Sequence, residues 1–284
     1  MKYNDPTQLV QSVRTIYSLP ANFHRINQAV DDINSSMDDI AEAILSDQSL
    51  ATRLLKLANS SFYGFPSKID TISHAVQMIG ARQLRDLIYA TSIIGVFEKI
   101  PANLVDMQSF WKHSIACGVI ARLLAARRRE PNTESFFLMG LVHDIGRLVL
   151  FQQMPDEAAT IMLQVSEEHV LVYEKEKQIL GFDHSDVGEA LMNVWKLPPR
   201  MAESVRLHHR FHTNGRFPTE SAIVHVTDVI VHALNIGSSG EKLVPPMHKD
   251  AWGRLDIPVE HISVLCKEAE RQYTEMAQLL LPKK

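Results

Sequence analysis

Histidine and aspartate residues recur in short motifs through the second half of the chain, and they are the side chains with the clearest chemistry. The stretch LVHDIGRLVL, from Leu141 to Leu150, sets His143 beside Asp144 inside an apolar run. Burial of a carboxylate among apolar neighbours is costly unless the carboxylate is paired or binds a metal ion. His143 and Asp144 are therefore the first candidates for metal ligands.

Further histidines and an aspartate fall at the ends or on one face of the expected helices. They are His113 in FWKHSIACG, His184 in GFDHSDVG, His208 and His209 in VRLHHRFH, and Asp228 in VTDVI. Imidazole and carboxylate ligands together suit iron, manganese, zinc, nickel or cobalt better than calcium, which prefers oxygen throughout. The ligand types leave the choice among these metals open. The sequence thus predicts a site for one or two divalent or redox metal ions.

Such a site would supply hydrolytic chemistry. A metal-bound water has a lowered pKa and can attack a phosphorus centre, while the ion neutralises charge on the phosphoryl oxygens. Neighbouring residues on a helix point about 100° apart, so His143 and Asp144 could approach an ion from two directions. Asp144, which has two oxygens, could also bridge two ions, and it is the candidate catalytic carboxylate.

Other polar residues favour a structural interpretation. A single histidine on an apolar helix face usually belongs to the core or its boundary and has a hydrogen-bond partner, so His74, His225 and His232 are left out of the candidate site. The run from Glu174 to Lys177 mixes both charges and predicts a solvated helix face.

The elements that must position these side chains are helices. Apolar residues recur at helical spacing almost throughout, and no alternating strand longer than a few residues is found, which predicts an all-α bundle of about ten or more helices. A bundle core holds facing side chains on rigid supports, so ligands distant in sequence can converge. Two helix pairs are expected first, one divided by Ser46 or Asp47 as an N-cap and one joined at Gly80. Later helices are expected at 107–128, 134–154, 155–165, 167–180, 185–195, 199–208, 219–233 and 259–281.

The chain is expected to divide into two helical subdomains that share one unit. Pro101 opens a linker, which separates an N-terminal subdomain, residues 1–100, from a second subdomain with a C-terminal helix, residues 101–284. The segment from Asn235 to Asp250 contains GSSG and a proline pair and is the best candidate for a mobile loop.

Composition narrows the class of protein. The formal charge of -4 argues against a nucleic-acid surface. Two distant cysteines, Cys117 and Cys266, form no disulfide framework and favour a reducing compartment. No signal peptide is recognised, and no apolar run approaches the ~18 residues that a membrane span needs. We therefore expect a cytoplasmic protein with no membrane segment.

The ordered motifs resemble those of a known superfamily. His113, then the His143-Asp144 pair, then Asp228 resemble the H...HD...D pattern of the HD metal-dependent phosphohydrolases. His184 and the His208-His209 pair sit where the HD-GYP branch has further ligands for a site of two or three metals.

The N-terminal half resembles the HDOD family, the HD-related output domain of bacterial signalling proteins. The resemblance rests on the segments LPANFHRINQAV, ILSDQSLATRLLKLANSSFYG and IDTISHAVQMIGARQLRDLI. The second half of the family pattern is matched by GFDHSDVGEALMNVWKLPPRMAESVRLHH. The resemblance runs from about Leu19 to Ala233 and implies an all-helical signalling or regulatory module. Members are commonly attached to receiver or sensory domains. With little chain before Leu19, the expected partner is a separate receiver or sensor protein, or a nucleotide ligand.

The sequence departs from the HD-GYP pattern at informative positions. HD-GYP phosphodiesterases carry HDIGK, where this chain has Arg147, and HHE, where it has Arg210; the GYP loop is absent. These departures argue against hydrolysis of cyclic-di-GMP in the HD-GYP manner.

Two functions stay open from the sequence. The first is a regulatory HDOD module with an HD-type metal site. The alternative is a metal-dependent phosphohydrolase acting on a nucleotide or cyclic nucleotide, with Asp144 and Arg147 as catalytic residues and Arg147 contacting phosphate. In that case His113, His143, Asp144 and Asp228 would hold the first metal, and His184, His208 and His209 would complete a second site.

Overall fold

The computed structural model describes residues 3, 5–12, 21–97, 100 and 104–281, and in these residues every regular element is a helix. The helices are α1 Pro6–Ser12, α2 Ala21–Asp31, α3 Met37–Leu45, α4 Gln48–Ala58, α5 Ile72–Ile79, α6 Ala81–Val96, α7 Met107–Arg127, α8 Thr133–Val142, α9 Ile145–Gln153, α10 Pro155–Glu168, α11 Val172–Leu180, α12 His184–Val194, α13 Pro199–Leu207, α14 Pro218–Ala233, α15 Lys249–Leu255 and α16 Ile262–Leu280. A short 3₁₀ turn, Val259–His261, precedes α16. The predicted all-α class is confirmed.

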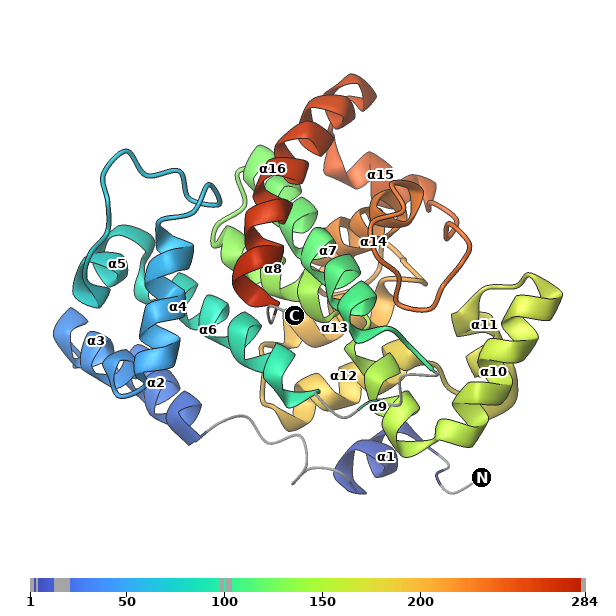
Figure 1. Ribbon diagram of the computed structural model, residues 1–284. Helices are drawn as coiled ribbons and strands as arrows, with labels where there is room; N and C mark the ends of the chain where they lie inside the picture. The colour runs from blue at the N-terminus through green and yellow to red at the C-terminus, as the bar shows by residue number, and fades with distance from the viewer. Residues whose placement is uncertain (1–2, 4, 13–20, 98–99, 101–103, 282–284) are drawn as a thin grey trace.

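Contacts between helices bring the elements that carry the candidate ligands together. Helix α7 packs against α8, α14 and α16, while α9 packs on α12, and α12 and α14 both pack on α13. Figure 1 shows α2 to α5 gathered at one end of the molecule and α10 with α11 at the opposite end. The helices that carry the candidate ligands, α7, α8, α12, α13 and α14, therefore meet in the middle of the fold.

The N-terminal helices are joined to this centre by direct contacts. Helix α6 packs on α8, and α4 touches α16. The backbone N–H of Ser61 donates to a carboxylate oxygen of Glu275 on α16 over 2.6 Å. Pro101, the expected linker residue, lies outside the described residues. A division of the chain near residue 100 stays a prediction.

Local capping signals explain several helix boundaries. Asp47 accepts a hydrogen bond from the N–H of Leu50 and caps α4, which is one of the two N-caps expected there. Gly80 stands between α5 and α6 with a φ of 99°, a conformation that favours glycine. Asp106 caps α7 by accepting from the N–H of Gln108.

The single helix expected over residues 134–154 is wrong in one respect that matters for the site. Helix α8 ends at Val142 and α9 starts at Ile145, so His143 and Asp144 form the junction between two helices. In a continuous helix the carbonyl of Gly140 would accept the backbone N–H of Asp144. Instead the ring of His143 bonds to this carbonyl over 2.8 Å. Apolar residues flank both sides of the junction, so the hydrophobic pattern gave no sign of the break.

One other expected helix boundary is corrected by the structure. The helix expected at 167–180 starts only at Val172, because residues up to Glu168 complete α10. The mobility expected for the segment from Asn235 to Asp250 stays a prediction; Ser239 and Glu241 within it are buried. Its last residues already belong to α15.

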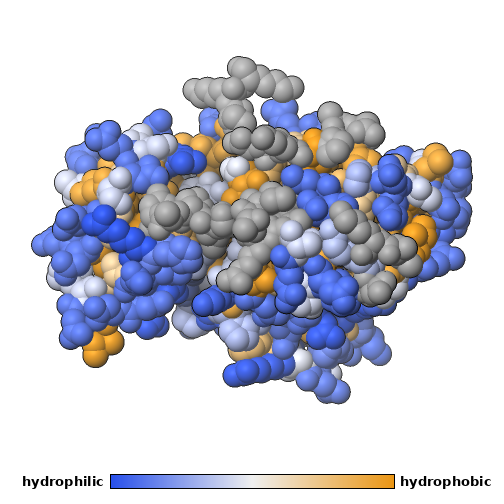
Figure 2. All heavy atoms as spheres, turned by 90° about the horizontal axis from the view of Figure 1, so that it is seen from below, coloured by the Kyte–Doolittle hydropathy of each residue, from blue (hydrophilic) through white to orange (hydrophobic). Residues whose placement is uncertain are grey.

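The outer surface is mixed. Figure 2 shows a face that is largely hydrophilic, with small hydrophobic groups between the polar side chains. No helix among the described residues has the length and apolar character needed to cross a membrane.

Candidate metal centre

The seven predicted ligands lie together in the core. Their side chains are each 3% exposed or less. Their donor atoms fall into two groups, and within each group the atoms lie within 4.8 Å of one another. One group comprises His113, Cys117, His143 and Asp228, and the other comprises Asp144, His184, His208 and His209.

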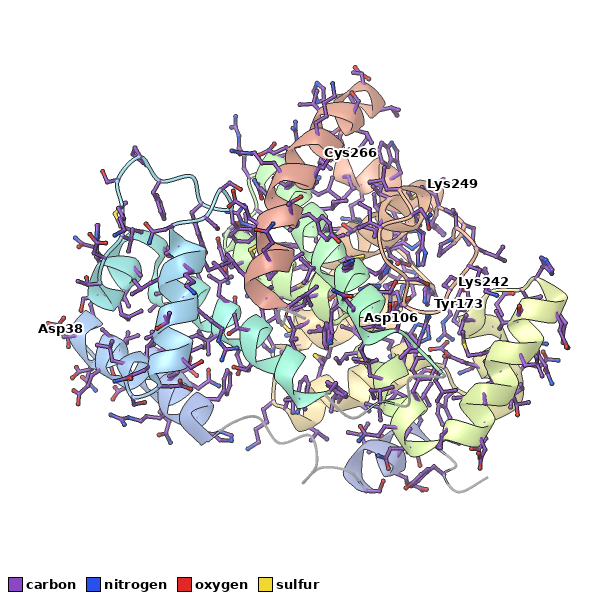
Figure 3. The ribbon with its side chains drawn as sticks, in the orientation of Figure 1. Asp38, Asp106, Tyr173, Lys242, Lys249 and Cys266 are labelled. Carbon is purple, nitrogen blue, oxygen red and sulfur yellow. The ribbon has the colours of Figure 1, made fainter. Side chains whose placement is uncertain are left out.

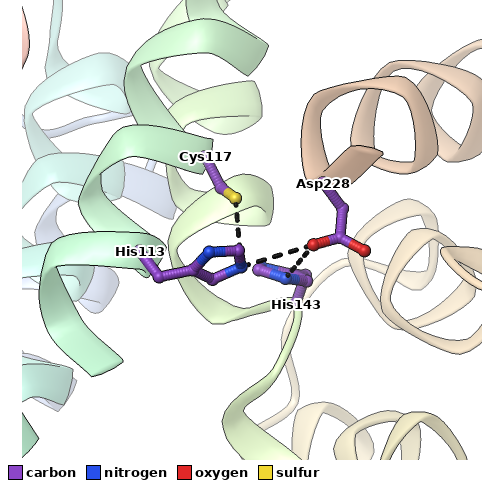
Figure 4. A group of neighbouring side chains, drawn as sticks. All are labelled: His113, Cys117, His143 and Asp228. Carbon is purple, nitrogen blue, oxygen red and sulfur yellow. Dashed lines mark hydrogen bonds and ion pairs between the residues drawn. The ribbon is translucent and has the colours of Figure 1, made fainter. Parts of the chain in front are cut away.

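The first group is built by α7, the end of α8, and α14. The Nε2 atoms of His113 and His143 each lie 3.3 Å from Oδ1 of Asp228. Figure 4 shows the two rings meeting the aspartate from α14, and the sulfur of Cys117 near the same Nε2 of His113 that faces Asp228. Residues separated by more than 100 positions in the sequence thus present their polar atoms to one small volume.

The same type of hydrogen bond at the C-terminal ends of two helices orients two of the histidines. His143 follows the last residue of α8 and its Nδ1 bonds the carbonyl of Gly140; His208 follows α13 and its Nδ1 bonds the carbonyl of Val205. Each ring donates an N–H to a carbonyl that has no partner within its helix. The Nε2 atom of each ring is then the one that faces the site.

His184 is placed by the start of α12 and by a carboxylate from α11. Asp183 caps the helix and forms a reciprocal capping box with Asp186. The Glu176 carboxylate accepts two hydrogen bonds from His184: one from the backbone N–H, over 2.9 Å, and one from the ring Nδ1–H, over 2.5 Å. Nε2 of His184 is thereby directed at Asp144, whose Oδ1 lies 3.0 Å away. A carboxylate behind a histidine in this way fixes its tautomer and orientation as a metal ligand.

Replacement of Glu176 with glutamine is expected to weaken metal binding at the second group by about 10- to 100-fold, the usual effect of losing such an outer partner. The amide keeps the size of the side chain but removes the charge that holds His184. Metal titration followed by calorimetry measures the change. Glu174→Gln, an exposed position on the same helix, is the matched control and should bind as the unchanged protein does. Equal affinities in both variants would contradict the role of Glu176.

Two carboxylates face both groups. Oδ1 of Asp144 lies 3.0 Å from His184 and 3.5 Å from His208, while its Oδ2 lies 3.4 Å from His143. Asp228 directs Oδ1 at the first group and Oδ2 toward Nδ1 of His209, 3.9 Å away. Since both carboxylates span the two groups, they can join two neighbouring ions.

The electrostatics keep these carboxylates ionised. Burial opposes ionisation of Asp144, yet the charges of Arg147 and His143 hold its pKa well below the usual range. Burial also opposes ionisation of Asp228, and His232 with the other nearby histidines lowers its pKa well below the usual range. Two ionised carboxylates buried so close together favour a bound cation.

The histidines divide into two kinds. Burial lowers the pKa of His113 to about 4, so its ring is neutral at pH 7. Burial opposes protonation of His143 as well, but Asp144 and Asp228 raise its pKa to about 10. An ion bound here would displace the proton of His143, because a metal-bound imidazole must present a lone pair.

The polar atoms fit a metal ion. Nε2 of His143, Nε2 of His208 and both oxygens of Asp228 are buried and have no hydrogen-bond partner of normal geometry among the described residues. Such orphaned groups are rare in folded proteins and call for an explanation. Ligand atoms about 2.1 Å from one ion lie about 3 to 4 Å from one another, which is the spacing found here. The residues present therefore fit one or two transition-metal ions.

Arg147 lies beside the centre, and its two terminal guanidinium nitrogens contact polar groups there. One of its guanidinium nitrogens donates to the carbonyl and hydroxyl oxygens of Ser239, both at 3.0 Å, and the other lies 3.7 Å from Asp144. The side chain is buried and ties the segment after α14 to the site. Its expected contact with phosphate stays a prediction.

Arg210, which replaces the glutamate of the HHE motif, has a structural role. Its guanidinium contacts the carboxylate of Asp183 and lies 3.3 Å from the hydroxyl of Ser185. Arg210 thus pairs with the residue that caps α12, and so supports the helix start that places His184.

Sequence reasoning missed several residues at the centre. Nε2 of His232 lies 3.2 Å from Asp228, one helical turn earlier on α14, and this i, i+4 spacing was a signal that could have included it. Glu176 had been assigned to a solvated face, but it is only 2% exposed, so that assignment is wrong. Nothing local in the sequence marks it. His225, in contrast, bonds a backbone group through each ring nitrogen, as expected for a structural histidine.

Similarity to other proteins agrees with the fold. An uncharacterised protein of Treponema pallidum is 25% identical over 202 residues, which cover 71% of this chain and 39% of that protein. The protein YuxH of Bacillus subtilis, also uncharacterised, is 24% identical over 57% of this chain and 42% of its own length. The chain thus spans about two fifths of the length of these curated relatives.

Solved structures share the whole architecture. An HDOD domain protein of unknown function from Geobacter sulfurreducens has a TM-score of 0.77 and 24% identity, covering 97% of this chain and 98% of its own. A provisionally named phosphohydrolase from Shewanella amazonensis has a TM-score of 0.75 and 23% identity, covering 96% and 98%. A provisionally named signal transduction protein from Marinobacter aquaeolei has a TM-score of 0.72 and 20% identity, covering 95% and 61%.

The family follows from a match between the sequence and a family model. The model of the HDOD domain matches residues 16–211, well over half of the chain. The match includes every candidate ligand except Asp228, which lies beyond its end. The chain belongs to the HDOD family.

Proposed function

We propose that this protein is a regulatory HDOD module whose core holds one or two transition-metal ions, and that it acts through a signalling partner. In this proposal His113, His143 and Asp228 hold one ion, and His184, His208 and His209 hold the other. Asp144 lies between them. The ions supply positive charge at a centre that otherwise contains two buried carboxylates.

The observation that carries the proposal is the burial of the whole ligand set. Every predicted ligand has a side chain that is 3% exposed or less. A catalytic metal needs an open coordination position that substrate and water can reach, whereas a structural metal is enclosed by its ligands. A centre enclosed in this way suits a metal that stabilises one conformation of a signalling domain.

The surroundings support the same role. Arg147 lies beside Asp144, and one of its guanidinium nitrogens already donates to both oxygens of Ser239. A similar fold in Marinobacter aquaeolei carries a provisional signal transduction name. We propose a receiver or sensor protein as the partner, since HDOD resemblance implies such partners.

A phosphohydrolase is the second candidate. It is favoured by the two ligand groups that share carboxylates, because paired ions can bind both the attacking and the leaving oxygen of a phosphoryl group. The provisional phosphohydrolase names of two Shewanella amazonensis proteins of similar fold point the same way. In this role Arg147 would have to leave Ser239 to contact phosphate.

A hydrolysis assay separates the two candidates. Protein reconstituted with Zn²⁺, Mn²⁺, Co²⁺ or Fe²⁺ is mixed with bis(4-nitrophenyl) phosphate or a cyclic dinucleotide. We expect no more turnover than in the double variant His143→Ala, Asp144→Ala, while removal of the metal lowers the melting temperature because the ion binds only the folded state. Turnover at about 1 s⁻¹ or faster that the double variant abolishes would establish the enzyme and overturn the regulatory proposal.

A further inference from the structure

Cys117 belongs to the buried polar cluster, although cysteine is not part of the HD ligand pattern. It lies one helical turn after His113 on α7, so both side chains leave the same face of the helix. The thiol is buried, and its sulfur is 3.6 Å from Nε2 of His113. Figure 4 shows it beside the two histidines and the aspartate of the first group.

Three of the six distances among the four ligand atoms match those around a tetrahedral ion, and all four atoms lie within 4.8 Å of one another. Nitrogen and oxygen ligands about 2.0 Å from a tetrahedral ion are about 3.3 Å apart, and a sulfur about 2.3 Å from the ion is about 3.6 Å from a nitrogen. The observed distances are 3.3 Å from His113 to Asp228, 3.3 Å from His143 to Asp228, and 3.6 Å from Cys117 to His113. All three agree with these values.

We propose that Cys117 is the fourth ligand of the ion held by His113, His143 and Asp228, and that this ion is Zn²⁺ in a closed tetrahedral site. The proposal deepens the proposed function and rests on it. As the sulfur–zinc bond forms, the S–H bond breaks and its proton passes to solvent. No oxidant or reductant takes part.

The ligand types select zinc from the metals that the histidines and carboxylates leave open. Thiolate favours softer ions than manganese, and a closed tetrahedral set of sulfur and imidazole ligands is typical of zinc. The second group, with Asp144 and three histidines, contains no sulfur. The two halves of the centre therefore differ in chemistry, and the first half has the ligand set of a closed zinc site.

The chain provides its own matched control, because it has only two cysteines. Cys266 lies on α16, outside both ligand groups (Figure 3). Replacing either cysteine with serine removes one thiol and changes little in volume. Only the replacement of Cys117 should alter metal binding.

Cobalt is the probe for the test. Zinc is removed with a chelator and the full chain is reloaded with Co²⁺, whose bond to a thiolate gives a charge-transfer band in the near ultraviolet. We expect this band in the unchanged protein and in Cys266→Ser, and its loss in Cys117→Ser. Competition with a zinc chelator should show that Cys117→Ser binds the ion more weakly by over about 100-fold, more than the loss of an outer partner causes.

The outcomes separate this inference from the proposed function. Cobalt bound without the thiolate band, or a band that persists in Cys117→Ser, overturns the role of Cys117 and leaves the metal centre standing. No bound metal in any form of the protein overturns both. If Cys117→Ser fails to fold, X-ray absorption at the zinc edge of Cys266→Ser decides, since a sulfur neighbour at about 2.3 Å can then come only from the Cys117 thiolate. A first shell of nitrogen and oxygen alone would refute the assignment.

Discussion

Replacement of Asp144 with asparagine is expected to empty both halves of the metal centre. The carboxylate directs one oxygen at His184 and the other at His143, so each ligand group loses an anionic contact at once. An amide keeps the shape but provides no negative charge to offset the ion. We expect the bound metal to fall from one or two ions per chain to nearly none, with affinity reduced by more than about 100-fold.

Metal content after dialysis, measured by elemental analysis, checks this result. His74→Gln is the control, because His74 lies on α5, outside both ligand groups, and should leave the metal content unchanged. Asp144 makes no side-chain hydrogen bond as a cap of α9, so its replacement should not unravel that helix. A variant that keeps its full metal content would show that the charge of Asp144 is not needed to hold metal in either group.

Replacement of Gly146 with alanine is expected to have the largest effect on folding. A methyl group at this position would lie 2.0 Å from the carbonyl oxygen of His184 and 2.6 Å from the backbone nitrogen of Gly188. Both atoms belong to the backbone of α12, so no side-chain rotation can relieve the contact. Helices α9 and α12 must move apart, and His184 moves away from Asp144. We expect a loss of about 3 kcal/mol or more in the free energy of unfolding, at the upper end of overpacking effects.

Chemical denaturation with and without metal measures this loss. Gly253→Ala is the matched control, because this exposed glycine lies within α15 and a methyl group there meets no atom within 4 Å. Alanine in a helix interior is preferred over glycine by about 0.5–1 kcal/mol, so the control should gain stability. Equal stability of the two variants would mean that α9 and α12 are not packed this closely.

The seven candidate ligands could be selected from the sequence because they are defined by residue type and order. An aspartate in an apolar run, as at Asp144, has few explanations other than pairing or metal binding. The helical periodicity likewise predicted the elements that bring the motifs together. What periodicity could not provide was the break after Val142, since a helix that is apolar on all sides looks the same whether it is continuous or interrupted.

The residues that orient the candidate ligands could not be identified from the local sequence. Glu176 stands in a mixed-charge run, and only the packing of α11 beside α12 brings its carboxylate to His184. Lys175, in the same run, is buried because it pairs with Glu168 at 2.6 Å. A mixed-charge run predicts exposed side chains only when no neighbouring element supplies a partner for its charges. Such partners can be identified only in three dimensions.

The departures from the HD-GYP pattern gain a physical meaning in the structure. Arg210 pairs with Asp183 at the start of α12, and Arg147 joins the site to Ser239. A guanidinium presents several donors in a fixed plane and can link several oxygens at once, whereas a lysine is a single flexible charge. Both arginines therefore connect elements around the centre.

The central claim is that the buried histidines and aspartates hold metal. The most direct test is a crystal of protein purified without chelator, with elemental analysis and anomalous diffraction recorded at the absorption edge of the metal found. The account predicts one or two anomalous peaks within the cluster, the first among His113, His143 and Asp228 and the second beside His184 and His208. Protein without transition metal, in which hydrogen bonds between these histidines and aspartates fill the same space, would contradict it.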